Sequence, residues 1–408
     1  MRPTPAPEWK IADIVKEYPA AREVFRQHGL DQLVNEDGLR VLSPFLTLGT
    51  ALRSRRIPVS VFMEQLEKAI GLDHPVEVEA PGLSDIGKQG DLTLLALMPC
   101  GLKMPFSRAI SAFLTQLRER DGLAVTYAVE GNLNQELSYY SYVEQIRDID
   151  ELPDIIVSAD FNTFYGRSFY QRFVATGQLC GYPGTGSAVN HAYRQAGIAT
   201  PDNGYTVLAV NPLVIVANLD ELGDRELPTG WHDLLEPRWQ RSVTLRGGGD
   251  FFCHAVLLPT YQRYGAAGLT RLGRNVLQGL HPAQMVKQID TGRPGALYVM
   301  PEFFAHRAIH KERIQIIWPT DGALASPVTL QVKSTKIEQL RPILDYLTGQ
   351  ELARILVGAR FPVPHGDVEG EVQGKPLWWL GWDYLASADL LARNREIDAI
   401  FMPLVAGR

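Results

Sequence analysis

The sequence has few cysteines, no large excess of one charge and no phosphate-binding signature. Three cysteines among 408 residues cannot form a disulfide framework and favour a reducing compartment. The net charge of −6 provides no overall field that would attract the chain to nucleic acid, so we expect no nucleic-acid partner. With 45% hydrophobic and 21% charged residues, the composition is that of a globular protein. The length predicts about two to four compact units.

Signals for export and for membrane insertion are also missing. Charged residues interrupt the start of the chain before an apolar signal-peptide core can form, at Glu8, Lys10, Asp13, Lys16 and Glu17. The longest uncharged apolar run, 203–219, has Asn211-Pro212 at its centre, and this pair disfavours a membrane span. We therefore predict two β-strands meeting at a turn there, no membrane insertion and a cytoplasmic location.

The first part of the chain has helical periodicity. Apolar residues recur at steps of three and four, which is typical of one buried helical face, at Ile11, Ile14, Val15, Tyr18, Ala21, Val24 and Phe25. This predicts a small all-helical domain over 1–72, followed by a polar linker over 73–90 that is rich in proline and glycine. So small a domain buries little surface, so we expect it to dock on something, and a protein partner is one candidate.

After residue 91, short apolar runs alternate with helical segments. Strands are predicted at 92–98, 123–129, 154–158, 242–245 and 296–300, and helices at 107–118 and 336–357. This alternation predicts an α/β protein with a mostly parallel, doubly wound sheet. In such sheets ligands bind beyond the carboxyl ends of the strands, so the residues that follow the strands are candidate site residues.

Two candidates follow strands in the first half of this region. Cys100 follows the strand at 92–98 after one proline and either faces a cleft, as a metal ligand or nucleophile, or is a small buried hydrophobic residue. Ser158 and Asp160 follow the next buried strand and either bind a ligand or cap the next helix.

A glycine-rich segment, Arg246 to Asp250, lies between a predicted strand and a predicted helix. Gly248 and Gly249 let the backbone approach a ligand closely, and a helix N-terminus favours anions. Asp250 is either part of this site or simply an N-cap. The segment lacks the Gly-Lys-Ser/Thr ending of a phosphate-binding loop, so nucleotide hydrolysis is not supported.

Cys253 and His254 come next and are adjacent in the sequence. On a helix their side chains diverge by about 100°, so at most one of them points into a cleft. A buried cysteine and a hydrogen-bonded histidine are an equally good interpretation of this pair.

Several segments resemble a known family. Residues 227–245, LPTGWHDLLEPRWQRSVTL, resemble a signature of ABC-transporter solute-binding proteins of the iron(III)-type subgroup, and the runs before and after them resemble the crossover strands and a later helix of that family. The resemblance implies a type II periplasmic-binding-protein fold, with one lobe from 91–212 and 326–408, a second lobe from 213–325 and a ligand in the cleft. The segment EYPAAREVFRQHGL resembles a small helical domain of unknown function.

One segment departs from the family pattern. Iron(III)-binding members carry an Asn/Gln-x-Tyr-Tyr motif where this sequence has Phe303 and Phe304. Phenylalanine has no donor atom, so a tyrosinate site for ferric iron is not implied here. The neighbouring Glu302 remains a candidate ligand, and the two phenylalanines are candidates for an apolar wall.

The leading hypothesis is a cytoplasmic solute-binding-like protein that senses, buffers or delivers a small ligand. A transition metal or metal complex would use Cys100 with Cys253, His254 or Glu302, whose sulfur, nitrogen and oxygen atoms suit such ions. A small anion would use Arg246, the backbone of Gly247 to Gly249 and Ser158.

Two alternatives stay open. Some enzymes share this fold, and in a cysteine-dependent transferase Cys100 would be the nucleophile, with Asp160, Glu302 or His306 as the base. The other alternative is the substrate-binding component of an ABC transporter.

Overall fold

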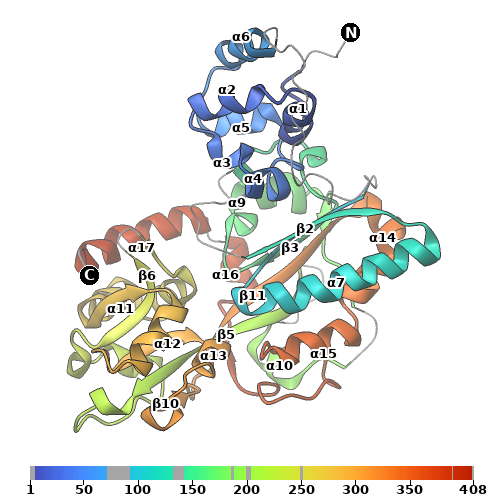
Figure 1. The fold of residues 1–408 in the computed structure, drawn as a ribbon. Coiled ribbons are helices and arrows are strands. Elements are labelled where there is room, and N and C mark those ends of the chain that lie inside the picture. Colours follow the sequence, from blue (N-terminus) through green and yellow to red (C-terminus); the bar gives the residue numbers. More distant parts are fainter. Residues whose placement is uncertain are drawn as a thin grey trace.

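The computed structural model contains a small helical domain attached to a larger two-lobed α/β unit (Figure 1). The structure describes residues 5–70, 92–131, 142–184, 188–198, 204–248, 251–387 and 389–406. The predicted linker at 73–90 lies outside these ranges. No helix in these ranges has the length and apolarity needed to cross a bilayer.

Six helices form the N-terminal domain: α1 (Ile11–Glu17), α2 (Ala21–Gln27), α3 (Asp31–Val34), α4 (Glu36–Val41), α5 (Leu48–Ser54) and α6 (Val59–Ile70). The predicted apolar face is buried, and the rings of Phe25 and Phe62 meet edge to face at 5.1 Å between α2 and α6. Gly29 ends α2 with a φ of +69°, which glycine adopts without steric cost. The prediction of an all-helical domain is confirmed.

This domain docks on the α/β unit through polar contacts. The hydroxyls of Thr47 and Thr50 both donate to the carboxylate of Glu151. Arg40 forms an ion pair with Glu130 at 2.5 Å, and Gln32 donates to the Tyr142 hydroxyl at 2.6 Å. All of these contacts are to the first lobe.

The first lobe contains β1 (Leu92–Met98), β2 (Val125–Gly131), β3 (Ile155–Ala159) and β4 (Leu179–Cys180), with α7 (Cys100–Asp121), α9 (Arg167–Phe169) and α10 (His191–Ala196). β1 lies between β2 and β3 and is parallel to both. β1 and β3 are almost continuously apolar, as expected for strands covered on both faces.

The second lobe contains β6 (Val243–Gly248), β7 (Phe251–Phe252), β8 (Val276–Leu280), β9 (Leu297–Pro301) and β10 (Ile314–Ile317), with α11 (His254–Asn275), α12 (Pro282–Asp290) and α13 (Glu302–Ala305). β6 is parallel to β8 and β9. The two lobes confirm the predicted two-lobed α/β fold.

Two long antiparallel strands, β5 (Thr206–Asn218) and β11 (Ala323–Lys333), run through both lobes. β11 pairs with β3 in the first lobe, whereas the end of β5 pairs with β9 and β10 in the second. We call the paired strands β5 and β11 the hinge. Asn211 and Pro212 lie opposite Ser326 and Ala325 in its middle. These crossing strands make the sheet mixed rather than mostly parallel.

The prediction of two strands meeting at a turn near Asn211 is wrong. β5 is a single strand that continues through Asn211-Pro212. The fixed φ of proline is compatible with extended structure, and its missing N–H removes only one donor from the ladder. The uncharged apolar run is therefore a strand buried along nearly its whole length.

The predicted helix at 336–357 is two helices, α14 (Ile337–Leu347) and α15 (Gln350–Gly358). The break falls at Gly349, whose backbone is extended, and a Cβ atom there would lie 2.6 Å from the Asp345 carbonyl oxygen. The close approach explains why glycine occupies the break.

The chain ends with β12 (Leu377–Trp378), α16 (Trp382–Ser387) and α17 (Leu390–Val405). α17 packs along α11 (Figure 1), with Phe401 against Phe252 at 5.3 Å between ring centroids. The predicted boundaries placed 326–408 in the first lobe, but this last helix packs mainly on α11 of the second lobe, and its start, at Leu391, lies against Gly166 of the first.

Candidate functional site

Arg246 and Asp160 meet between the lobes. Arg246 lies near the end of β6 in the second lobe, and its Nη1 atom is 3.9 Å from Oδ2 of Asp160, which follows β3 in the first. Both side chains are 23% exposed. The Asp160 N–H donates to the carbonyl of Pro327 in β11 at 2.8 Å, which places this pair beside the hinge.

The backbone of Asp160 is in the left-handed region, with a φ of +70°. Non-glycine residues adopt this conformation at a cost, and aspartate tolerates it because its short side chain can hydrogen-bond locally. Here Oδ1 accepts from the Phe161 N–H at 2.9 Å. Such strained residues cluster at functional sites, where the surrounding structure fixes them.

Two thiols from opposite lobes lie around the same guanidinium. Burial lowers the pKa of Arg246, but the neighbouring Cys253, Asp160 and Cys100 outweigh this effect and hold the pKa above its ordinary value. Cys100 is exposed and is the first residue of α7, whereas Cys253 is buried. The structure thus brings together four of the predicted site residues.

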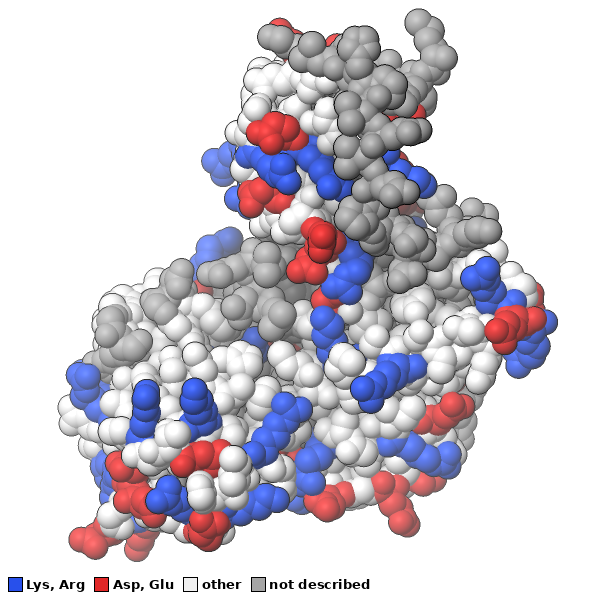
Figure 2. Space-filling model, viewed as in Figure 1, with Lys and Arg blue, Asp and Glu red and all other residues white. Residues whose placement is uncertain are grey.

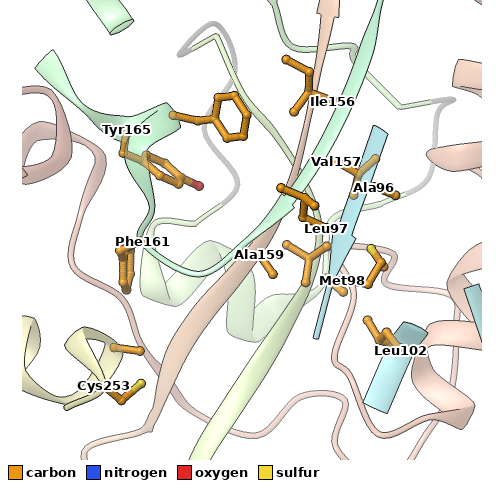
Figure 3. Packing of buried hydrophobic residues seen from close by; sticks show 14 of the residues in the cluster. Ala96, Leu97, Met98, Leu102, Ile156, Val157, Ala159, Phe161, Tyr165 and Cys253 are labelled. Carbon is orange, nitrogen blue, oxygen red and sulfur yellow. The ribbon is translucent and has the colours of Figure 1, made fainter. Parts of the chain in front are cut away.

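The Cys253 thiol is held in its neutral form. Burial raises its pKa to about 11, the charge of Asp160 acts in the same direction, and Arg246 opposes both. Cys253 is one of the buried residues drawn in Figure 3, together with Met98 of β1 and Ala159 of β3. It is therefore a neutral wall of the site rather than a thiolate.

Further residues surround Arg246. Its Cζ atom lies 5.8 Å from the centroid of the Phe251 ring. Burial and, second, the charge of Arg246 lower the pKa of His281, which precedes α12 and caps it by accepting from the Ala283 N–H. No pattern in the sequence indicated His281 as a site residue.

The glycine-rich segment belongs to two antiparallel strands, whereas the sequence predicted that it leads directly into a helix. Gly248 pairs with Phe251 across β6 and β7, and α11 begins at His254 with Cys253 as its N-cap. Gly249 and Asp250 lie outside the described residues. The prediction that these glycines lead directly into a helix N-terminus is therefore wrong, because β7 separates them from α11.

Ser158 does not reach this site. It is a residue of β3 and lies inside the sheet between Leu97 of β1 and Thr329 of β11. Its side chain is buried. Asp160 is the residue that leaves the strand and reaches the site.

Two predicted metal donors are bound elsewhere. Both Glu302 oxygens accept from Arg360 at 2.6 Å, and Glu302 also contacts His306 at 2.8 Å. His254 pairs through Nε2 with Asp398 of α17 at 2.9 Å. Cys253 is the extended N-cap of α11, so the helical divergence predicted for this pair does not apply. The set of Cys100, Cys253, His254 and Glu302 is therefore not assembled as one metal site.

Another group of possible metal ligands lies on the second lobe. Among the described residues, His232, Asp233 and Glu236 bring their ligand atoms within 4.8 Å of one another. However, Asp233 accepts from the Thr229 and Gly230 N–H groups, and Glu236 pairs with Arg238 at 2.7 Å. These contacts account for the cluster without a metal ion.

Phe303 and Phe304 form an apolar wall. Phe303 stacks on Phe361 at 5.3 Å between centroids and lies against Gly101 at the start of α7. The guanidinium of Arg307 covers both rings, at 5.4 and 5.1 Å. No phenolate oxygen is present at either position, so the residues present do not fit a tyrosinate iron site.

Two α/β lobes, two crossing strands and a site beside the hinge define a two-lobed ligand-binding protein. The chain belongs to the family described as bacterial extracellular solute-binding protein, whose model matches residues 150–388. Residues 6–63 match a second model, described as a domain of unknown function (DUF1858). No curated protein sequence matches the chain.

Solved structures share the fold at low sequence identity. A Trichodesmium protein titled IdiA or FutA, in complex with iron and citrate, is 11% identical with a TM-score of 0.54, covering 77% of this chain and 99% of that one. The ferric binding protein from Campylobacter jejuni is 12% identical with a TM-score of 0.53 and the same coverage. Apo ferric ion-binding protein A from Pasteurella haemolytica is 15% identical with a TM-score of 0.53, covering 76% and 98%.

Proposed function

We propose that this protein binds a small anion, a carboxylate or an oxyanion, between its lobes at Arg246. The observation that carries the proposal is a largely buried guanidinium whose carboxylate partner among the described residues, Asp160, is as far away as 3.9 Å. A guanidinium presents five donors in a planar fork that suits carboxylates and oxyanions. A ligand carboxylate at normal hydrogen-bond distance would bind this fork better than Asp160 does.

The surroundings favour an anion over a bare metal cation. A positive charge at Arg246 repels a cation in a partly buried site. Cys100 begins the 22-residue helix α7, and the N-terminus of a long helix favours negative charge. The two features act on the same place, because Cys100 is an electrostatic neighbour of Arg246.

A metal–carboxylate complex is the second candidate ligand. One relative of the same fold is titled as a complex with iron and citrate. In such a complex Arg246 would hold the carboxylate, and the exposed Cys100 thiol would be the available soft donor. Phe303 and Phe304 provide no ligand atom, so a transition metal would have to bring most of its ligands with it.

The biological role belongs to the same proposal. We expect a cytoplasmic protein that senses, buffers or delivers its ligand, and its support is that all three cysteines are unpaired. The family is also compatible with delivery of the ligand to an ABC transporter. A partner protein that binds the N-terminal domain is part of the same proposal. Fractionation of cells that express the full chain, followed by detection with an antibody, distinguishes cytoplasm from periplasm.

A cysteine-dependent transferase is favoured by one observation, the exposed Cys100 near a positive charge. Of the proposed bases, Glu302 and His306 are bound to each other, which leaves Asp160. Fast iodoacetamide labelling at neutral pH that is lost in Cys100→Ala would support the enzyme. Slow labelling would exclude a reactive thiolate.

Isothermal titration calorimetry of the full chain with citrate, ferric citrate, phosphate and sulfate tests the binding proposal. We expect at least one of them to bind and its affinity to fall at least 100-fold in Arg246→Gln. Arg313→Gln, which removes an arginine paired with Asp220 on the second lobe, is the matched control. Equal affinity in wild type and Arg246→Gln, or binding of none of the four, would overturn the proposal.

A further inference from the structure

Among the described residues, two ion pairs join the lobes. The first is the loose pair of Arg246 and Asp160 at 3.9 Å. The second links Glu302 of α13, in the second lobe, to Arg360, which follows α15 in the first. Arg360 belongs to the first lobe because Phe361 bonds back to Leu356 of α15, and the carbonyl of Pro362 accepts from Val210 in the first half of β5.

The second pair has the geometry of a strong interaction. Nε and Nη2 of Arg360 each donate to a different oxygen of Glu302, both at 2.6 Å. Only 2% of the Glu302 side chain is exposed. Bidentate pairs of this kind are charge-assisted and geometrically specific. His306 on the same carboxylate and Glu371 on the same guanidinium extend the network.

The backbone is in the left-handed region at one residue of each junction. Among the described residues, four that are not glycine have a positive φ: Arg56, Asp160, Arg241 and Arg360. Two of the four are the first-lobe partners in the two interlobe pairs, with φ values of +70° for Asp160 and +71° for Arg360. At Arg360 this conformation ends α15, because the Phe361 N–H donates back to the Leu356 carbonyl, and the guanidinium at this helix end reaches Glu302.

An apolar contact accompanies the second pair. Phe303 is next to Glu302 on α13, and its ring lies against Gly101 and stacks on Phe361, both of the first lobe. Consecutive residues of one short helix thus make a polar and an apolar contact to the opposite lobe. Both contacts would separate if the lobes rotated apart about β5 and β11.

We propose that Glu302 and Arg360 form an interlobe latch that stabilises the closed arrangement of the two lobes independently of any ligand. The looser pair differs in role, because a ligand anion can replace Asp160 at Arg246 without breaking the latch. By favouring the closed arrangement, the latch lowers the cost of closure that a ligand would otherwise bear and so raises its affinity. The proposal rests on the two lobes and not on the identity of the ligand.

Small-angle X-ray scattering of the full chain without added ligand tests the latch. In Glu302→Gln we expect a larger radius of gyration and maximum dimension than in wild type. The matched control is Asp154→Asn, which breaks another buried pair, with Lys333 at 3.1 Å, inside the first lobe. The control should lower the melting temperature and leave the radius of gyration unchanged. If Glu302→Gln is folded and has the wild-type radius of gyration, the latch does not exist.

A second variant covers the case in which Glu302→Gln does not fold. Arg360→Lys keeps the charge but loses the bidentate fork, so it should open the lobes partially without leaving Glu302 unpaired. Wild-type scattering from Arg360→Lys would then overturn the proposal. Because both measurements are made without ligand, failure to bind any anion at Arg246 leaves their outcome unaffected.

Discussion

The ring of Phe303 lies so close to Gly101 that a Cβ atom on residue 101 would be 2.6 Å from Cε2 of the ring. The two residues belong to opposite lobes, so their contact exists only when the lobes are together. In Gly101→Ala we expect the interlobe contact to be lost, because the ring is packed on Phe361 and cannot move freely. Overpacking of this kind costs about 1–3 kcal/mol, against about 1 kcal/mol gained in helix propensity.

Thermal unfolding and scattering check this prediction together. Gly101→Ala should unfold at a lower temperature and have a larger radius of gyration. Gly358→Ala is the control, because it also replaces a helical glycine but meets no atom within 4 Å. If Gly101→Ala is as compact and stable as this control, the contact is not needed for closure.

His281 should report the charge at Arg246. Burial is the larger reason for its lowered pKa, and the positive charge of Arg246 is the second. Arg246→Gln should therefore raise the pKa of His281 toward its ordinary value, as should an anion bound at Arg246. A pH titration of the imidazole resonances by NMR measures the shift, with Arg313→Gln as the control. An unchanged titration would show that the two groups do not interact.

The buried thiol of Cys253 predicts a loss of stability in alkali. Its pKa is raised to about 11 by burial, above the ordinary value of 9.0. Because the pKa of this thiol is higher in the folded than in the unfolded chain, its neutral form stabilises the fold fully below about pH 9. This stabilisation is lost as the pH rises through 11. Two pKa units correspond to roughly 3 kcal/mol.

Urea unfolding between pH 8 and 10, below the range where most buried tyrosines ionise, measures this loss. Cys253→Ala should have a lower free energy of unfolding at pH 8 and a flatter dependence on pH. Cys100→Ala, which removes the exposed thiol, should keep the wild-type slope. A wild-type slope in Cys253→Ala would assign the alkaline loss to other groups.

The seam between the N-terminal domain and the first lobe depends on Glu151. Burial raises the pKa of its carboxyl, but hydrogen bonds from Thr50, Thr47 and two backbone N–H groups outweigh burial and lower it. A lowered acid pKa adds stability above about pH 4.5 that is lost as the pH falls. The docking of the domain should therefore weaken in acid.

Thr50→Val removes one of these donors while keeping the shape of the side chain. Bonds to charged groups contribute about 1.5–3 kcal/mol, so the N-terminal domain should become more accessible to protease and unfold earlier. Glu23→Gln, at an exposed pair with Arg26 inside the same N-terminal domain, is the control. Equal protease resistance in both variants would contradict the role of this seam.

Periodicity and apolar runs in the sequence predicted the helical N-terminal domain and several central strands of both lobes. The strand at 92–98 matches β1, and the apolar face of α1 and α2 is buried as expected. The continuity of β5 could not be predicted, because a proline disfavours a strand unless the partner strand, far away in sequence, tolerates it. The break at Gly349 depends in the same way on a contact between backbone atoms.

The candidate site was predicted in part. Arg246, Asp160 and the two cysteines follow strands or begin helices, and the general rule for strand ends places such residues near a cleft. The partners of Glu302 and His254 could not be found, because Arg360 and Asp398 lie far away in the sequence. Local spacing contains no information on ion pairs of this separation.

The position of α17 has a mechanical consequence. β5 and β11 connect the two lobes. A third connection leads to α17, which packs on the second lobe through contacts with His254 and Phe252. A lobe that is connected to its neighbour at three points can rotate towards it but resists torsion relative to it. The two lobes should therefore open and close by rotation in one plane. Removal of α17 should also permit torsion of one lobe relative to the other.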